Sequence, residues 1–284
     1  MRTLLNRRRV MGGGIPIDEE GYNGGYLTLT ALEDTTFTLV MGSLMDTGDL
    51  VGIYYSIDDG DSWVYTANVN NQEVSATTPL IHKSEHVLWK GVNKRLSRSR
   101  NAGYSSYFSS NGLFSVGGSL QSMIWGDEYE TKLSTKDWMS YLFLFRGSKV
   151  KNAKNLRFTA TSMHNGTYNG LFENCVYLTV PPSEIGYGGG GAYEYAFQGC
   201  TSLLSSPDIL IASPSSTCLK NMFTGCTSLK YIKILSTNIS ATNCLQNWVQ
   251  NVPSGGTFVK ASGVTFPSGA SGIPNGWTVE EVTI

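Results

Sequence analysis

The chain has 284 residues, of which 40% are hydrophobic and only 15% are charged, and its formal net charge is -1. Soluble proteins usually carry about 25% charged residues, and a nearly neutral chain lacks the basic surface that nucleic acids attract. No stretch reaches the ~20 apolar residues that span a membrane. We therefore expect neither nucleic-acid binding nor membrane insertion, and the 32 glycines favour short strands and many turns.

Residues 1–24 predict a basic, flexible arm. The arginines Arg2, Arg7, Arg8 and Arg9 and the glycines that follow them offer little apolar surface to bury. The glycines also interrupt the apolar stretch of about 7–15 residues that a secretory signal requires. The chain is thus expected to fold in a reducing cytoplasm, where its five cysteines would be free thiols.

Residues 25–93 predict a small β-sandwich. Apolar and polar residues alternate over 26–30 and 36–40, and the segments 51–55 and 87–89 have the composition of further short strands. Turn residues separate these segments, and a series of short strands at this spacing is typical of a sandwich. We interpret this part of the chain as an adaptor domain.

Residues 94–140 are predicted to link the β-sandwich to the repeat region that follows. They are also predicted to form the N-terminal cap of that repeat region. The segment 108–125 has the pattern of a β-hairpin in which Gly117 and Gly118 form the turn.

Residues 141–252 contain an internal repeat. Phe172, Phe197 and Phe223 are 25 and 26 residues apart. A leucine and a cysteine keep the same register in each copy: Leu178, Leu203 and Leu229, and Cys175, Cys200 and Cys226. A degenerate earlier copy, Leu144-Phe-Arg-Gly-Ser148, has serine at the cysteine position, and a degenerate last copy begins at Trp248.

A fixed period of about 20–29 residues with leucine and cysteine at set positions indicates a leucine-rich solenoid. One copy is too small to bury its own apolar face, so the phenylalanines and leucines of successive copies are expected to form one buried column. The cysteines would recur because this column admits only a small apolar side chain. We predict a helical turn before each phenylalanine and a strand-rich cap over residues 253–284, which makes the fold class α+β but β-rich.

The unit Met222-Phe-Thr-Gly-Cys-Thr-Ser-Leu229, preceded by Cys218-Leu-Lys-Asn, resembles the BspA-type leucine-rich repeats of gut Bacteroidetes and their phages. The stretches Val87-Leu-Trp-Lys-Gly91 and Gly272-Ile-Pro-Asn-Gly-Trp-Thr-Val279 also look like proteins carried by Bacteroides phages and prophages, including crAss-like phages. The resemblance covers nearly the whole chain. This chain departs from the BspA-type pattern in two places. Ser148 stands at the cysteine position of the first repeat, and a run of four glycines follows Cys175.

The resemblance implies a fibre or appendage component of a virion, assembled in the host cytoplasm. The expected partners are other virion proteins, of the capsid or the tail, and a polysaccharide or protein of the host cell surface. Analogy with other fibres implies a homo-oligomer, and specifically a trimer. The arm arginines would anchor the chain while the repeats face outward. Two alternatives stay open: a bacterial BspA-like surface adhesin, and a glycan-cleaving enzyme built on an Asp-box.

Three motifs resemble catalytic or binding signatures, but their context predicts structural roles. Ser56-Ile-Asp-Asp-Gly-Asp-Ser-Trp63 fits the Asp-box of sialidases, and a single copy is interpreted as a hairpin turn. His82-Lys-Ser-Glu-His86 matches an inverted zinc-protease motif, but the adjoining strand leaves no room for the helix that this motif needs. The glycines of 186–191 lack the βαβ unit of a nucleotide site and are interpreted as a flexible loop. We therefore predict no enzyme activity, no metal and no cofactor.

Tyrosines beside this glycine-rich segment suggest a glycan contact. Tyr187 and Tyr193 flank the glycines, and an exposed aromatic ring can stack on the face of a sugar. Core packing is favoured at least as much for Tyr193 and Tyr195, because both closely precede Phe197.

Overall fold

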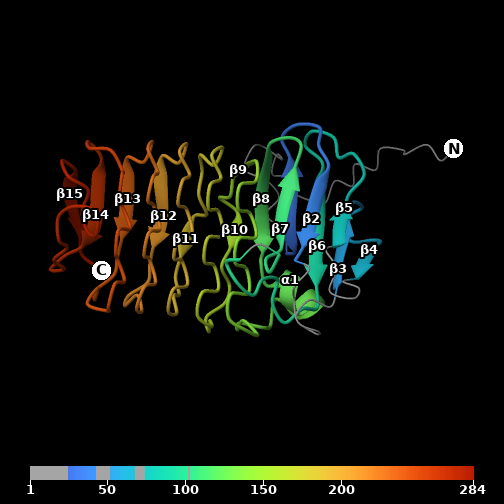
Figure 1. Cartoon of the computed structure of the whole chain (residues 1–284), viewed down its shortest axis with the longest axis horizontal. Helices are drawn as coiled ribbons and strands as arrows, with labels where there is room; N and C mark the ends of the chain where they lie inside the picture. Colours follow the sequence, from blue (N-terminus) through green and yellow to red (C-terminus); the bar gives the residue numbers. More distant parts are fainter. Residues whose placement is uncertain (1–24, 43–51, 68–73, 102) are drawn as a thin grey trace.

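The computed structural model describes residues 25–42, 52–67, 74–101 and 103–284. The arm predicted at residues 1–24 lies outside these ranges. The body is elongated, with the N-terminal sheets at one end and the repeat copies side by side towards the other (Figure 1). It is β-rich, because the helices of the described residues are limited to α1 (Ser122–Trp125) and the 3-10 helix η1 (Gly126–Glu128). Neither has the length and apolar character that crossing a bilayer requires.

Two sheets build the N-terminal end. The larger has the strand order β10-β8-β1-β6-β3-β4, with β9 also paired to β8, and the smaller has the order β5-β2-β7. The strands of the larger sheet are β1 (Leu27–Ala31), β3 (Gly52–Ser56), β4 (Val64–Ala67), β6 (His86–Gly91), β8 (Phe114–Ser119), β9 (Val150–Asn152) and β10 (Leu156–Arg157). Those of the smaller sheet are β2 (Phe37–Met41), β5 (Val74–Thr77) and β7 (Tyr107–Ser110).

Aromatic side chains connect the two sheets. The rings of Phe37 in β2 and Phe114 in β8 meet edge to face with their centroids 5.4 Å apart. Trp89 in β6 meets Phe108 in β7 in the same way at 5.0 Å. All four side chains are buried, and large buried aromatics dominate core energetics. One apolar core therefore holds both sheets.

The larger sheet joins parts of the chain that the sequence separates. Strand β8 pairs antiparallel with β1, with Leu29 opposite Val116. On its other side β8 pairs parallel with β9 and β10, which belong to the first repeat copy. The hydrogen-bonded sheet thus crosses both boundaries, at residues 93 and 140, that the sequence predicts between domains.

The hairpin predicted over 108–125 is wrong. Strand β8 continues through Gly117 and Gly118, and α1 follows it where the returning strand was expected. Both edges of β8 are already paired, so neither is available to a returning strand. The Ser122 hydroxyl accepts a hydrogen bond from the Leu27 amide and donates one to the Trp89 carbonyl, each at 2.9 Å. These bonds hold α1 against β1 and β6.

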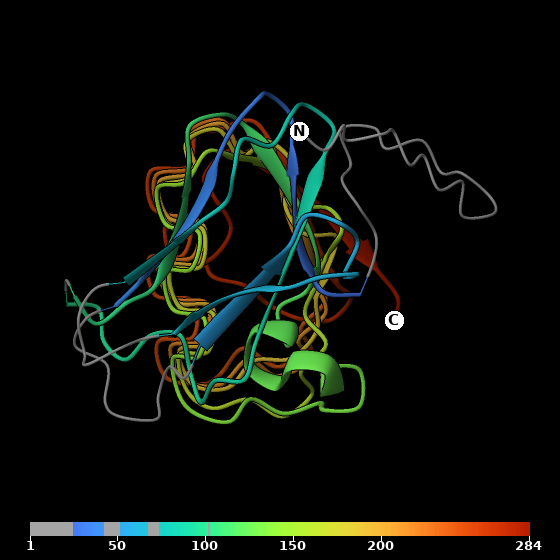
Figure 2. The ribbon, with the colours of Figure 1, turned by 90° about the vertical axis from the view of Figure 1, so that its right-hand side faces the viewer.

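A five-stranded parallel sheet, in the order β11-β12-β13-β14-β15, forms one wall of the repeat region (Figure 1). Its register is regular at the C-terminal end, where Ile232 lies opposite Phe258 and Phe258 opposite Val279. The strands are β11 (Glu184–Ile185), β12 (Ser205–Ile209), β13 (Tyr231–Ile234), β14 (Thr257–Ala261) and β15 (Thr278–Val282). Viewed along the long axis, the traces of successive copies superimpose (Figure 2).

Tight turns replace the helical turns predicted before the phenylalanines. In one copy Thr217, Asn221 and Gly225 have φ angles of 55°, 55° and 76°, and the equivalent positions of the other copies also have positive φ. Alternate amides bond to the next copy; the Phe223 amide, for example, donates to the Trp248 carbonyl at 2.7 Å. A right-handed helix cannot form here, because every fourth residue is left-handed and the alternate amides bond outside their own copy.

Candidate functional site

The repeat phenylalanines form one column of stacked rings. Ring centroids are 5.4 Å apart between Phe172 and Phe197 and 5.6 Å apart between Phe197 and Phe223. Phe145, from the copy that has serine at the cysteine position, extends the column at 5.3 Å from Phe172. These rings are buried, as are the repeat leucines Leu178, Leu203 and Leu229. The side chains hold the copies together and offer no surface to a ligand.

The repeat cysteines form a second column, in which each thiol donates a hydrogen bond to the copy before it. The bonds are Cys175 Sγ to Phe145 O at 2.8 Å, Cys200 Sγ to Phe172 O at 3.1 Å and Cys226 Sγ to Phe197 O at 3.1 Å. Small size is therefore only part of the reason for cysteine. Sequence reasoning missed the hydrogen bond, although Ser148 in the first copy, another small donor, was a signal for it.

All five cysteines are free thiols, as the sequence predicts. Burial raises the pKa of Cys175, Cys218 and Cys226 to about 12, and it raises the pKa of Cys200 well above its usual value. Because the thiolate is the reactive form, we expect the folded protein to resist a thiol reagent at about pH 8. Denaturation without reductant should then expose all five thiols, and a smaller number would indicate a disulfide.

The two tyrosines considered for glycan contact lie in different environments. Tyr187 is 53% exposed, whereas Tyr193 is 1% exposed. The Tyr193 ring stacks on Tyr168 with the centroids 5.3 Å apart, and Tyr168 stacks on Tyr141 at 5.5 Å. The sugar contact considered for Tyr193 is therefore wrong and its alternative, core packing, is confirmed, because the ring belongs to a second buried aromatic column.

The four consecutive glycines of the glycine-rich segment, 188–191, are packed into the stack. The Gly190 carbonyl accepts a hydrogen bond from the Gly166 amide at 2.9 Å, and the Gly191 amide donates to the Ser216 carbonyl at 3.1 Å. A Cβ on Gly188 would lie 2.5 Å from Cys218 Sγ. The interpretation as a flexible loop missed this packing, in which the absence of a side chain at Gly188 permits a close approach.

The close approach of Gly188 to Cys218 predicts that alanine substitutions at Gly188 and at Gly186 have different effects on the free energy of unfolding. Gly188→Ala should lower the free energy of unfolding by about 1–3 kcal/mol, because the added methyl group overpacks the core. Gly186→Ala is the matched control, since a Cβ there would meet nothing within 4 Å, and it should change stability by less than about 0.5 kcal/mol. Urea denaturation of both variants measures the difference, and equal effects would contradict the packing.

The Asp-box residues form the turn between β3 and β4. Asp58 accepts hydrogen bonds from the amide and the hydroxyl of Ser62 at 2.9 and 2.5 Å, and the Ser56 hydroxyl accepts one from the Gly60 amide at 2.8 Å. Gly60 has a φ of 91°. Hydrogen bonds from Ser62 and then Ser56 lower the pKa of Asp58. The aspartate thus serves the turn itself, as the hairpin interpretation predicts.

The two histidines of the zinc-protease motif contact different carboxylates. His82 Nδ1 lies 3.2 Å from Asp34, and His86 Nε2 lies 2.7 Å from Asp59. The segment between them is a turn followed by β6. Among the residues that the structure describes, no three His, Cys, Asp or Glu side chains form a group that could hold a metal ion.

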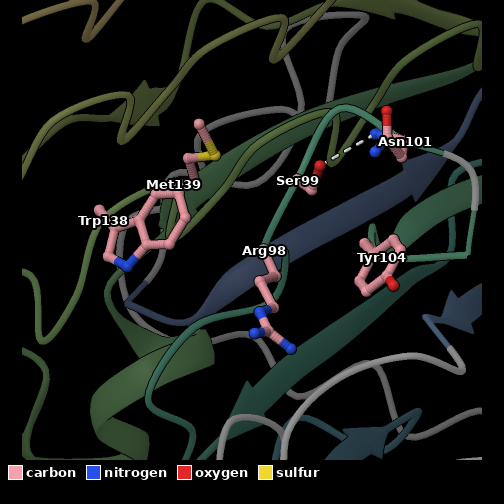
Figure 3. A pocket seen from close by; sticks show the side chains of 6 residues that line it. All are labelled: Arg98, Ser99, Asn101, Tyr104, Trp138 and Met139. Atoms are coloured by element: carbon pink, nitrogen blue, oxygen red, sulfur yellow. Dashed lines mark hydrogen bonds between the residues drawn. The ribbon is translucent and has the colours of Figure 1, made fainter.

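A cleft of about 330 Å³ lies where the loop after β6 meets the first repeat copy (Figure 3). Its lining residues are Arg98, Ser99, Asn101, Tyr104, Trp138 and Met139. Trp138 is 42% exposed, and the nearly buried Arg95 guanidinium lies 5.1 Å from its ring centroid. The cleft therefore presents a half-exposed indole ring that has a buried cation close to it.

Ion pairs with basic residues of the loop after β6 hold the residues around this cleft. Asp137 accepts a hydrogen bond from the Trp138 amide at 2.8 Å and pairs with Lys94 at 3.0 Å and Arg95 at 3.6 Å. Burial by itself would raise the pKa of Asp137, but the hydrogen bonds from Lys94 and the Trp138 amide and the charge of Arg95 together lower it. Arg100 ties the same loop to the repeats, because it pairs with Glu173 at 3.1 Å.

A second pocket, of about 280 Å³, lies beside the Asp-box turn. Its lining residues are Tyr54, Trp63, Lys90, Gly91, Val92, Gly126 and Asp127. The Lys90 ammonium donates to Asp127 Oδ1 at 2.7 Å and lies 4.0 Å from the Trp63 ring centroid. The Tyr26 hydroxyl donates to the same carboxylate oxygen at 2.7 Å. These two hydrogen bonds, that of Lys90 first, lower the pKa of Asp127.

The arm arginines Arg2, Arg7, Arg8 and Arg9 lie outside the described residues, so their anchoring role stays a prediction. The described residues form a β-rich protein, and the cleft at Trp138 and the pocket at Trp63 both lie on its N-terminal half. Comparisons with protein-family models, with curated proteins and with solved structures found no match to this chain.

Proposed function

We propose that this chain is a structural protein of a phage virion, a fibre or appendage component that displays a BspA-type leucine-rich solenoid for attachment to the host surface. In this proposal the N-terminal sheets form a sandwich-like adaptor. Other virion proteins bind the basic arm, and the assembly is a homo-oligomer made in the host cytoplasm.

The observation that carries the proposal is the continuity of the body from the N-terminal sheets to the last strand. Strand β8 pairs directly with the first repeat copy, and buried residues from both halves belong to one apolar cluster. A shared core resists bending between the two halves, whereas separate domains move relative to one another by default. A stiff, elongated body suits a component that holds a binding surface away from a particle.

The exposed aromatics support attachment to a glycan. Trp138 and Tyr187 are exposed large side chains on the cleft and the repeats, respectively, and aromatic rings with one accessible face contact sugars well. Copies of such a surface in an oligomer would bind a polymer by many weak contacts, which raises the overall affinity without a single strong site.

The hydrogen bonds of the Asp-box weigh against the glycan-cleaving alternative. Asp58 accepts hydrogen bonds from the Ser62 amide and hydroxyl within its own turn, so its carboxylate supports the hairpin. An adhesin on a bacterial surface remains the runner-up, since the same repeat display would serve a cell as well as a particle.

Detection of the chain in purified particles would test the proposal. An antibody against the purified protein should label phage particles in immunoelectron microscopy, and mass spectrometry should find the chain in gradient-purified virions. Labelling of bacterial envelopes with none on the particles would support the adhesin. Turnover of sialosides by the purified protein would support the enzyme and refute the structural role.

A further inference from the structure

We propose that the pocket beside the Asp-box turn binds the terminal ring of a neutral sugar. This goes beyond the proposed function, which assigns no ligand to the N-terminal sheets. The site is formed by two aromatic walls, Tyr54 and Trp63, and by the Lys90–Asp127 pair.

Contacts behind each aromatic ring hold it in place. Tyr54 packs on Tyr65 with the ring centroids 4.7 Å apart, and Trp63 meets the Tyr26 ring at 5.1 Å in an edge-on arrangement. Trp63 directly follows the hydrogen-bonded Asp-box turn, which fixes its backbone. Rings that are fixed before binding lose little conformational freedom when a sugar packs against them. The Asp-box therefore acts here as a positioning element for Trp63.

The Lys90–Asp127 pair supplies the polar groups that a sugar ring needs. The Asp127 side chain is 67% exposed and that of Lys90 is 13% exposed. Within the described residues, Lys90 and Tyr26 both donate to Oδ1 of Asp127, so Oδ2 can accept a sugar hydroxyl. An ammonium group has three donors, and Lys90 can use another one for a neighbouring hydroxyl.

The charge and size of the pocket select the class of ligand. The lining contains one cation, Lys90, and one anion, Asp127, and no other ionisable side chain except the phenol of Tyr54. An anionic sugar would bring a second carboxylate close to Asp127, and like charges at short distance disfavour binding. A volume of about 280 Å³ suits one ring, with the remainder of a chain in solvent.

Two pairs of variants of the full chain test the site. Asp127→Asn removes the charged acceptor, and Glu280→Gln, at an exposed position of β15 outside the pocket lining, is its charge-matched control. Val92→Arg obstructs the pocket from a residue that is 56% exposed, and Val279→Arg, on a 42% exposed residue of β15, is its control. Thermal melting checks that each variant is folded, and Val92→Arg keeps the test valid if Asp127→Asn is unstable.

The probes are the methyl pyranosides of glucose, galactose, mannose and N-acetylglucosamine, with methyl glucuronide as the acidic counterpart. Saturation-transfer NMR detects binding, and titration gives the Kd. We expect at least one neutral glycoside to bind with a Kd on the order of millimolar, as for a small ligand in an open site. Asp127→Asn and Val92→Arg should each raise this Kd by about tenfold or more, because each removes or blocks a charged hydrogen bond, and both controls should leave it unchanged.

Three results would overturn the inference: no neutral glycoside binds, the glucuronide binds more tightly than every neutral sugar, or binding is the same in the variants and their controls. The last result would indicate that the sugar binds to another surface, such as the cleft at Trp138. The virion assignment can fail separately, because it depends on finding the chain in particles and not on sugar binding by the purified protein.

Discussion

Replacing Phe197 with alanine should lower the free energy of unfolding by about 3–5 kcal/mol, the usual cost of truncating a buried phenylalanine. Its ring has neighbours on both sides, with centroids 5.4 Å away at Phe172 and 5.6 Å away at Phe223. The two adjacent copies are also joined by backbone hydrogen bonds, so they cannot close the space that the ring leaves. Urea denaturation followed by circular dichroism measures the loss.

Two neighbouring leucines provide the control for this prediction. Leu203 is fully buried and Leu204 is 57% exposed. Leu203→Ala should cost about 2–5 kcal/mol, whereas Leu204→Ala should cost less than about 0.5 kcal/mol. If Phe197→Ala were as mild as Leu204→Ala, the ring column would not be the main source of stability in the repeats.

Removing residues 1–14 should abolish association with virions and leave the remaining chain folded. The reason is chemical: four arginines in a short segment can pair with carboxylates on a partner surface through two hydrogen bonds each. The removed residues lie before the first described residue, and the apolar core of the described residues is formed by side chains from Leu27 onwards. The truncated chain should therefore melt at the same temperature as the full chain. Co-sedimentation with particles that lack the native protein measures the loss of association.

A full-length variant separates the charge of the arm from its length. Replacing Arg2, Arg7, Arg8 and Arg9 with glutamine should reproduce the defect of the truncation. The same change at Lys149 and Lys151, basic residues of the first repeat copy, should leave association intact. Normal assembly of the truncated chain would contradict the anchoring role of the arm.

Periodic and local signals account for what could be predicted from the sequence. The spacing of Phe172, Phe197 and Phe223 indicates contact between copies, because equal positions in stacked repeats must face one another. The Asp-box turn was also predictable, since Asp58 bonds to Ser62, only four residues away. The burial of Cys175, Cys200 and Cys226 followed from the same register, because small buried residues recur at one position of the stack.

Pairings between distant residues could not be predicted, because nothing in a short window encodes them. Tyr193 and Tyr187 lie on either side of the same glycines, yet stacking on Tyr168 buries only Tyr193. The acceptor of the proposed sugar site, Asp127, meets Lys90 and Tyr26, which are 37 and 101 positions away.

The β-rich character, the repeat register and the burial of its phenylalanines, leucines and cysteines can all be derived from residue type and period. Which strand edges are available and which side chains meet depends on the folded chain. Strand β8 had partners on both sides, so residues 122–125 became α1 in place of a strand. Such competition for hydrogen-bonding partners is resolved only when the whole chain has folded, because the competing groups come from segments far apart in the sequence.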